Sequence, residues 1–327
     1  MMKVDNVLEP PFENTAAKNP LAITHPSIIA YRGTLLRPKD GQNGMKAYLD
    51  ANLRPTRLDN IYQHLHYAEA PRFARPLHRQ RLLGREIVIT EDISEHLVWK
   101  QSNDPKIFIK PLSAYLLNYG FWKEHLCSDI ELHKSACGLL LSYVCLVSWE
   151  SDFRIAMNNN LIPVDLDWNT WTGFVHSFTG FINMESLHQV ARRYQYGELR
   201  LTRLNRIYRF MPTVFSLRNH FRGFMGTSAW YRDIFRQNFG WILAVFAIFS
   251  VALSGMQVAL MANQLGHNSN FHRASYGFAV FSLVALAAFV GVVIGYWVLL
   301  IVYFGIIAKL YHDEVQSARR SKSPTLV

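Results

Sequence analysis

The sequence predicts a mainly α-helical protein with a small antiparallel β element and a two-helix transmembrane hairpin at its C-terminal end. Two long uncharged apolar stretches lie after residue 238, although the mean hydropathy of the 327-residue chain is only +0.02. Before them, apolar residues recur mostly at helical spacing. Convincing strand composition, rich in β-branched and aromatic residues, is confined to residues 85–111.

The N-terminal part is predicted to be an irregular arm followed by short helices. Residues 1–42 contain five prolines and no sustained apolar period. Helices are expected from Asn43 and from Thr56, the second with Leu58, Ile61, Tyr62 and Leu65 on one face. They begin a mostly helical cytoplasmic domain that we expect to cover residues 43–191.

Three segments are predicted strands: residues 85–91, 95–100 and 106–111. Residues 101–105, with the sequence QSNDP, have the composition of a turn. The second and third strands should therefore pair as a hairpin, with the first alongside.

The rest of this domain is predicted to be helical. A helix should begin near Pro111, and a longer one after Ser128, which with Glu131 three residues later fits a capping box. The apolar centre of that helix is shorter than the ~20 residues that cross a bilayer, so it indicates a core helix. Asp167 and Asn183 are expected to cap two further helices.

Two histidines and two cysteines fall close together, as His125, Cys127, His133 and Cys137. Nitrogen and sulfur ligands of this kind suit zinc, but the spacing matches no standard zinc motif. Cysteine is also a common core residue. We therefore favour buried thiols and surface imidazoles, and predict no metal, no cofactor and no catalytic residues.

Residues 192–238 form an arginine-rich juxtamembrane segment, with ten arginines against two acidic residues, a net charge of +8. Within it, arginines at every third position run beside an apolar stripe, a pattern typical of a basic amphipathic helix. We favour contact with the anionic cytoplasmic leaflet over packing of the stripe on the soluble domain, and both over nucleic-acid binding. The predicted lipid-contacting residues are Arg200, Arg203, Arg206 and Arg209.

The predicted transmembrane helices cover residues 239–262 and 276–308, joined by a short loop at 263–275 and followed by a tail at 309–327. Each is uncharged and long enough to cross a bilayer core. Basic residues gather before the first helix and after the second, which predicts that both termini are cytoplasmic and that the loop is not.

Small residues in the second apolar stretch predict close helix packing. Gly291 and Gly295 form a GxxxG motif, and Ala287 extends the row by one turn. The row fits packing of the two helices into a hairpin or formation of a homo-oligomer. Gln257, in the first stretch, is expected to hydrogen-bond across to another helix.

Several segments resemble a family of filamentous-fungal membrane proteins defined by a domain of unknown function. They are LLGREIVITEDISEHLVW, IFIKPLSAYLLNYGFW, YGELRLTRLNRIYRF and MQVAL followed by FHRASYGFAVFS. The resemblance covers about residues 82–305. It implies a helical cytosolic region followed by two membrane helices, and it implies no activity.

The function predicted from the sequence is that of a non-enzymatic, membrane-anchored interaction or scaffold protein. Its expected partners are the lipid bilayer and a second copy of the chain, with no nucleic acid. The alternative is an oligomeric CorA-like ion channel or transporter, which shares the topology. Gly255-Met256-Gln257 departs from the Gly-Met-Asn of those channels at its last residue, and the apolar stretches carry no charge to mark an ion path.

Overall fold

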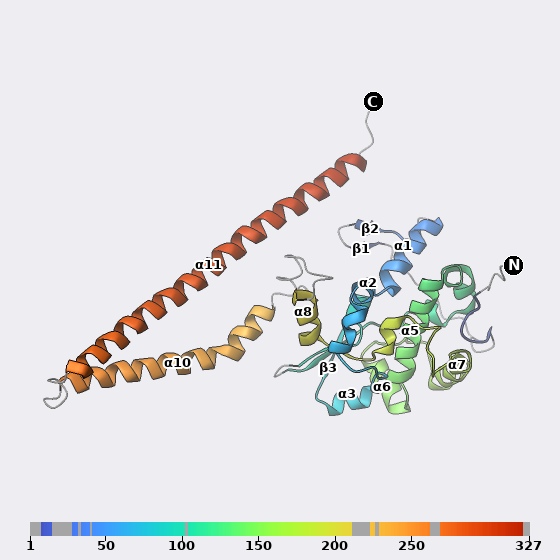
Figure 1. Ribbon diagram of the computed structural model, residues 1–327. Coiled ribbons are helices and arrows are strands. Elements are labelled where there is room, and N and C mark those ends of the chain that lie inside the picture. Colours follow the sequence, from blue (N-terminus) through green and yellow to red (C-terminus); the bar gives the residue numbers. More distant parts are fainter. Residues whose placement is uncertain are drawn as a thin grey trace, which may run out of the picture. The chain divides into compact units, whose positions relative to one another are not determined.

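A computed structural model of the chain describes residues 8–14, 28–31, 34–39, 41–101, 104–210, 223–225, 229–261 and 269–322. The chain divides into two compact units, Met1–Thr227 and Ser228–Val327 (Figure 1). Residues 262–268, which include the first six residues of the predicted loop, lie outside the described residues, as do 211–222 and 226–228 of the arginine-rich segment.

The first unit is mainly helical, with one two-stranded and one four-stranded sheet among its described residues. The strands are β1 (Ile29–Tyr31), β2 (Thr34–Leu36), β3 (Glu86–Ile89), β4 (Val98–Lys100), β5 (Lys106–Ile109) and β6 (Leu199–Arg200). The α-helices are α1 (Gly41–Leu53), α2 (Thr56–Asp59), α3 (Leu77–Leu82), α4 (Tyr119–Phe121), α5 (Ile130–Leu146), α6 (Glu150–Asn158), α7 (Trp168–Phe181) and α8 (Leu201–Phe210). Shorter 3-10 and π turns are η2 (Tyr62–Tyr67), η3 (Ile93–Glu95), η4 (Ala114–Leu117), η5 (Trp122–Leu126) and η6 (Arg192–Gln195).

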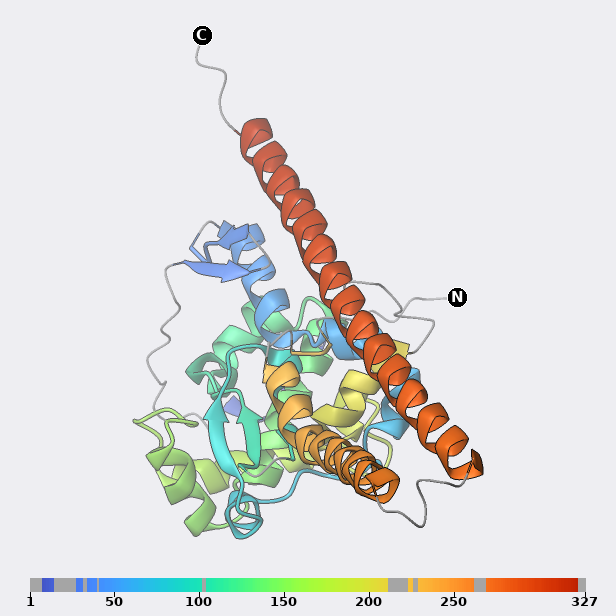
Figure 2. The same cartoon turned by 90° about the vertical axis from the view of Figure 1, so that its left-hand side faces the viewer.

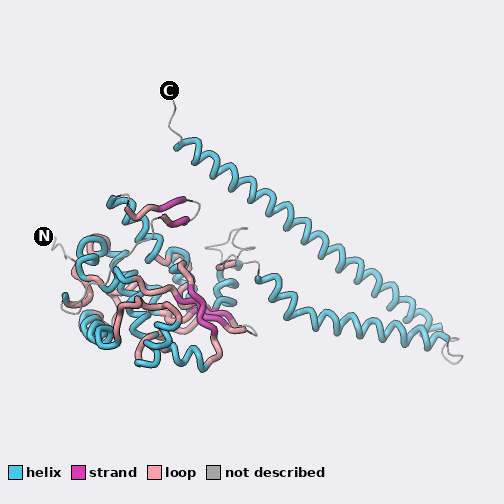
Figure 3. Tube along the Cα trace, turned by 180° about the vertical axis from the view of Figure 1, so that it is seen from behind, coloured by secondary structure: helices cyan, strands magenta, loops and turns pink. Residues whose placement is uncertain are grey.

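The four-stranded sheet has the order β3-β5-β4-β6 and is mixed. Its centre is the predicted antiparallel hairpin, in which Val98 of β4 faces Phe108 of β5. The outer strands β3 and β6 each run parallel to their neighbour. Figure 3 shows these strands running side by side, with helices forming most of the rest of the unit. The hairpin prediction is confirmed, and β6, which comes from the arginine-rich segment, was not foreseen.

The predicted N-terminal arm is more ordered than its prolines suggested. The side chain of Phe12 is fully buried, with its ring 4.9 Å from that of Phe174 and 5.9 Å from that of Trp122. Strands β1 and β2 form a small antiparallel hairpin that lies beside α1 (Figures 1 and 2). The arm prediction is therefore wrong for these parts, because buried side-chain contacts order a segment that lacks a local period.

Helix α5 runs through the hydrophobic core. Twelve of its seventeen residues are buried, as its apolar centre predicted. Its N-cap is Asp129, whose carboxylate accepts hydrogen bonds from the backbone N–H groups of Glu131 and Leu132. The predicted cap, Ser128, is wrong by one residue. Asp129 also pairs with Arg54 at 2.7 Å, a contact from a distant segment that favours the carboxylate at this position.

The next predicted caps have different outcomes. The carboxylate of Asp167 caps α7 by accepting from the N–H groups of Asn169 and Thr170, as predicted. Asn183 starts no α-helix. Its side-chain oxygen accepts from the N–H groups of Glu185 and Ser186 and so closes a turn, a structure that competes with a helix.

The arginine-rich segment is not a separate juxtamembrane element up to residue 210. Turn η6, strand β6 and helix α8 all belong to the first unit. Arg193 is 1% exposed inside that unit. The domain boundary predicted at residue 191 therefore falls too early, because a count of charges does not show which arginines are buried.

The second unit consists of two long helices, α10 (Ala229–Met261) and α11 (Ser269–Lys322). Within the described residues, one helical segment, Arg273–Val292, is long and apolar enough to cross a membrane, while Leu243–Ala259 of α10 is apolar but shorter. Helices α5 and α6 pass the same test only when taken together, and they meet at a 113° bend inside the core. Helices thus occupy both predicted span regions, but only one passes the test, so the predicted two-helix transmembrane hairpin is not confirmed.

Candidate functional site

The apolar side of α8 is buried within the first unit. Its residues Leu204 and Ile207 are 0% and 3% exposed. They pack with Leu58, Ile61 and Leu65, from the segment that precedes and forms η2. Burial of each such side chain stabilises the folded chain by roughly 1.5–3 kcal/mol. The stripe is therefore covered by protein in this structure and is not available to enter a lipid surface.

The four arginines of the predicted lipid-contacting set lie in different environments. The side chain of Arg209 is buried. Arg200 is half-buried, with its guanidinium 5.3 Å from the centre of the Trp99 ring and a hydrogen bond to the side chain of Gln101. Arg209 therefore does not lie on the predicted lipid-contacting surface. Residues spaced by three do not stay on one side of a helix, and Arg209 lies on the packed side.

Arg203 and Arg206 are exposed. Arg203 donates to the backbone oxygen of Ala68 at 3.3 Å, so one nitrogen is held against the end of η2 while the side chain remains accessible. Contact with anionic lipid stays a prediction for these two residues.

Two other arginines of this region hold the fold together. Arg193 donates to the backbone oxygens of His96 (2.8 Å) and Tyr196. Burial lowers the pKa of its guanidinium to about 10, with Tyr194 and Asp59 acting in the opposite direction. The group therefore keeps its charge at neutral pH, and it joins η6 to the sheet.

Glu198 forms a buried ionic cluster with Arg75 and Arg85. Both guanidinium groups lie 2.5 Å from its carboxylate, and the side chain of Gln80 donates to it at 2.8 Å. Burial acts to raise the pKa of Glu198, but these hydrogen bonds outweigh it and lower the pKa to about 2. Charge-assisted hydrogen bonds of this kind connect the start of β6 to α3.

The predicted histidine and cysteine cluster does not converge on one point. His133 donates through Nε2 to the backbone oxygen of Glu9 at 2.9 Å, and its Nδ1 lies 3.6 Å from the sulfur of Cys137. The ring of His125 packs on that of Phe121. Burial raises the pKa of the Cys127 thiol to about 11, assisted by Glu9. Within the described ranges, no three His, Cys, Asp or Glu side chains lie close enough to hold a metal ion.

The predicted membrane packing residues Gln257, Ala287, Gly291 and Gly295 are all exposed on α10 and α11. A Cβ atom placed at Gly291 or Gly295 would meet nothing within 4 Å. The described contact between the two helices includes Phe249 and Phe278, whose rings stack at 5.8 Å, and it lies away from these glycines. The small-residue row is uncovered in the single chain, so its packing partner stays a prediction.

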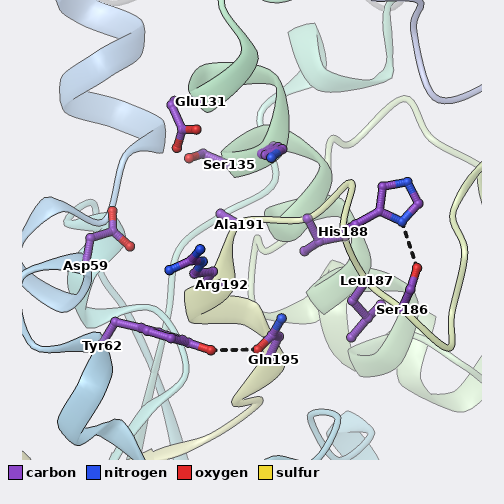
Figure 4. A pocket seen from close by; sticks show the side chains of 12 residues that line it. Asp59, Tyr62, Glu131, Ser135, Ser186, Leu187, His188, Ala191, Arg192 and Gln195 are labelled. Atoms are coloured by element: carbon purple, nitrogen blue, oxygen red, sulfur yellow. Dashed lines mark hydrogen bonds between the residues drawn. The ribbon is translucent and has the colours of Figure 1, made fainter.

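A polar pocket of about 610 Å³ lies between α2, η2, α5 and the segment of residues 186–195 (Figure 4). Its lining includes two acidic residues, Asp59 and Glu131, and two basic residues, Lys134 and Arg192. Cavities of this size commonly bind small molecules. The pocket brings together residues from three distant parts of the sequence.

The charged groups of the pocket do not pair with one another. In the part of the chain that the structure describes, none of the four takes part in an ion pair within 4 Å. The guanidinium of Arg192 lies 5.7 Å from the centre of the Tyr62 ring, and the Tyr62 hydroxyl donates to Gln195 at 2.8 Å. Burial raises the pKa of Asp59, and the nearby carboxylate of Glu131 raises it further.

At the other end of the pocket, the hydroxyl of Ser186 lies 2.7 Å from Nδ1 of His188. Both side chains are exposed, and within the described chain no carboxylate hydrogen-bonds to the His188 ring. A serine nucleophile also needs a third group to orient the histidine. The contact is therefore a local one between residues two apart, and it does not have the arrangement of a hydrolase triad.

Sequence reasoning did not select the pocket or the Glu198 cluster. Asp59 and Arg192 are 133 positions apart, and nothing in the local pattern around either residue links them. For Glu198, the sequence offers one indication: it is one of two acidic residues among ten arginines, which favours a buried ion pair with arginine.

Residues 45–286 match DUF6601, described as a family of unknown function, and this region covers most of the chain. No curated protein and no solved structure matches.

Proposed function

Because the chain belongs to DUF6601, a family of unknown function, we propose its role from its own residues: a non-enzymatic, membrane-anchored interaction or scaffold protein. In this proposal α11, with α10 beside it, lies in a lipid bilayer. The first unit is a folded cytoplasmic domain that presents binding surfaces.

The apolar exterior of α11 carries the proposal. Large apolar side chains point outward on every side of the segment Arg273–Val292, with Leu283 at 69% and Val292 at 71% exposed. About 20 apolar residues cross a bilayer core. Exposure of so much contiguous apolar surface to water would be costly, whereas lipid chains accept it.

Three further features support the arrangement. Basic residues flank the apolar helices on the side of both termini, which favours a cytoplasmic location for both. Arg203 and Arg206 are exposed and suit an anionic leaflet. The uncovered row of Ala287, Gly291 and Gly295 suits close packing against a second copy, which would make the protein a homo-oligomeric anchor.

The anchor is tested by alkaline carbonate extraction of membranes from cells that produce the full chain or residues 1–227. We expect the full chain to remain in the membrane pellet and the shorter chain to be released. Release of the full chain would contradict the proposal. Protease protection of tags at the two termini tests whether both are cytoplasmic.

Self-association is tested by cross-linking the full chain in detergent. We expect a dimer or another small assembly that Gly291→Leu weakens, while the matched Ala285→Leu, about 120° around α11 from Gly291, leaves it unchanged. A pentamer with a continuous polar path would instead favour the channel that the sequence left as an alternative.

A further inference from the structure

The pocket between α2, α5 and η6 contains charges of both signs without an internal partner. Asp59 and Glu131 are acidic, Arg192 and Lys134 are basic, and within the described chain none forms an ion pair. Figure 4 shows the side chains of Asp59, Glu131 and Arg192 pointing into the same space. Unpaired charges in a partly enclosed site are best satisfied by a ligand with complementary charges.

Ser135 adds an uncharged hydrogen-bonding group to the pocket lining. Its side chain is 4% exposed and lines the pocket, and it makes no hydrogen bond to any described residue. The Ser135 oxygen is not among the buried polar atoms without a partner in the described chain, so it is open to the pocket and free to hydrogen-bond to a ligand there. Ser135 lies one helical turn after Glu131, so both side chains are on the same face of α5, and Figure 4 shows both oxygens at the upper wall of the pocket.

The remaining walls limit what the ligand can be. The Tyr62 hydroxyl is already used by Gln195, and the Tyr62 ring supports the Arg192 guanidinium. The guanidinium therefore presents its free edge to a carboxylate, the group that it binds best. The two carboxylates and the Ser135 hydroxyl suit a primary ammonium, which donates three hydrogen bonds.

We propose that this pocket binds a small zwitterion, a free amino acid or a short peptide, with its ammonium group at Asp59, Glu131 and Ser135 and its carboxylate at Arg192. A purely anionic ligand would meet two carboxylates, and a purely cationic ligand would meet Arg192 and Lys134. The inference goes beyond the membrane-anchor function and does not depend on it.

The test uses the full chain in detergent micelles. Thermal shift is measured with the twenty free amino acids and with a set of alanine-containing dipeptides, and each hit is then titrated by calorimetry. We expect at least one zwitterion to bind saturably. Its N-acetylated and its carboxamide derivatives should each bind at least tenfold more weakly, because each lacks one charge.

Variants locate the site. Asp59→Asn, Arg192→Gln and Ser135→Ala should each weaken binding of that zwitterion, the first two by at least tenfold. All three should fold, because none removes a hydrogen bond or an ion pair within the described chain. Asp165→Asn and Arg79→Gln, at exposed positions outside the pocket lining, serve as matched controls and should leave affinity unchanged.

The inference is overturned if no compound binds, or if binding survives both Asp59→Asn and Arg192→Gln. A singly charged derivative that binds as tightly as its parent would also overturn it. Neither result bears on carbonate extraction, so failure here and failure of the membrane anchor can be told apart.

Discussion

Helices α5 and α11 use similar side chains in opposite ways. Leucine is the commonest residue of α5, and alanine and valine are the commonest of the apolar segment of α11, yet most of α5 is buried and the apolar segment of α11 is almost wholly exposed. Helix α5 stops at Leu146, where the chain bends by 113° into α6, whereas the apolar run of α11 continues. Apolar composition alone therefore does not show whether a helix is surrounded by protein or by lipid. The length of the run and the surrounding structure decide whether protein or lipid covers it.

The two units also treat charge differently. The first unit buries Lys110, Arg193 and Glu198 and gives each a partner from another segment. The second unit carries no charged residue between Tyr276 and Ala308. Water-soluble folds tolerate buried charges that are paired, and the bilayer interior favours their absence.

The largest effect is expected when a buried charge of the first unit loses its partner. Glu198→Gln leaves the guanidinium groups of Arg75 and Arg85 without their carboxylate, and breaking a buried pair costs roughly 3–5 kcal/mol. Urea denaturation followed by tryptophan fluorescence should show this loss. Glu150→Gln, in an exposed pair with Arg154, should change the free energy of unfolding by less than about 0.5 kcal/mol. Equal changes in the free energy of unfolding for the two variants would contradict the difference between buried and exposed charges.

The same cluster predicts how stability depends on pH. The pKa of Glu198 is about 2 in the folded chain against 4.5 as its ordinary value, so its ionised form stabilises the fold above that ordinary value. As the pH falls from 4.5 toward 2, roughly 3 kcal/mol should be lost. Denaturation curves at several pH values test this, and Glu198→Gln should remove that part of the dependence. A wild-type stability that stays constant over this interval would contradict the role of the cluster.

The next effect compares two exposed valines. Val284→Arg places a charge in the apolar segment of α11, and an arginine near the middle of a bilayer costs roughly 2.5–3.5 kcal/mol. Carbonate extraction should release a clearly larger fraction of this variant. Val164→Arg, at a position of the first unit that is 78% exposed, should leave extraction unchanged. If both variants behave alike, the exposed surface of α11 does not face lipid.

A smaller effect is expected at a close approach between helix and turn. A Cβ atom at Gly138 of α5 would lie 2.0 Å from the Tyr194 ring, so Gly138→Ala forces the ring to move and should cost roughly 1–3 kcal/mol. Gly173→Ala, in α7 with nothing within 4 Å, should stabilise by up to about 1 kcal/mol through helix propensity. Thermal unfolding distinguishes the two, and opposite signs are the expected result.

The smallest effect concerns the surface of α8. Replacing Arg203 and Arg206 by glutamine should weaken binding of residues 1–227 to phosphatidylserine vesicles by roughly 1 kcal/mol for each residue. Arg154→Gln, on α6, is the control with the same loss of charge. Unchanged vesicle binding by the double variant would end the lipid-contact prediction for α8.

Local signals were sufficient for several elements. Asp167 caps α7, and the turn composition of residues 101–105 separates the two strands of the hairpin. Local sequence did not show that Asp129 rather than Ser128 is the N-cap of α5. Lys46 in α1 and Arg54, the residue after α1, both pair with the Asp129 carboxylate and so favour it. The prediction of a helix after Asn183 is also wrong, because the Asn183 side chain closes a turn by accepting from the backbone N–H groups of Glu185 and Ser186.

The candidate site was harder to predict from a sequence pattern. The amphipathic helix predicted from the arginine spacing is α8, although Arg200 lies before it in β6. The apolar stripe of α8 packs on residues 58–68, more than a hundred positions earlier. The pocket needs the approach of Asp59, Glu131 and Arg192, which only the folded chain brings together. The long apolar helices of the second unit were easier to predict, because an uncharged apolar run can be counted along the sequence.

The parallel pairing of β6 with β4 has a consequence for protein synthesis. Leu199 pairs with Val98, so the sheet stays incomplete on the ribosome until about a hundred further residues have been made. Helix α8 then follows at once and covers the apolar surface of residues 58–68. The segment that begins at Arg273 is made about 60 residues later, which at ~5–20 residues per second is a delay of roughly 3–12 s. The order of the chain thus lets the first unit close before the most apolar helix, α11, leaves the ribosome.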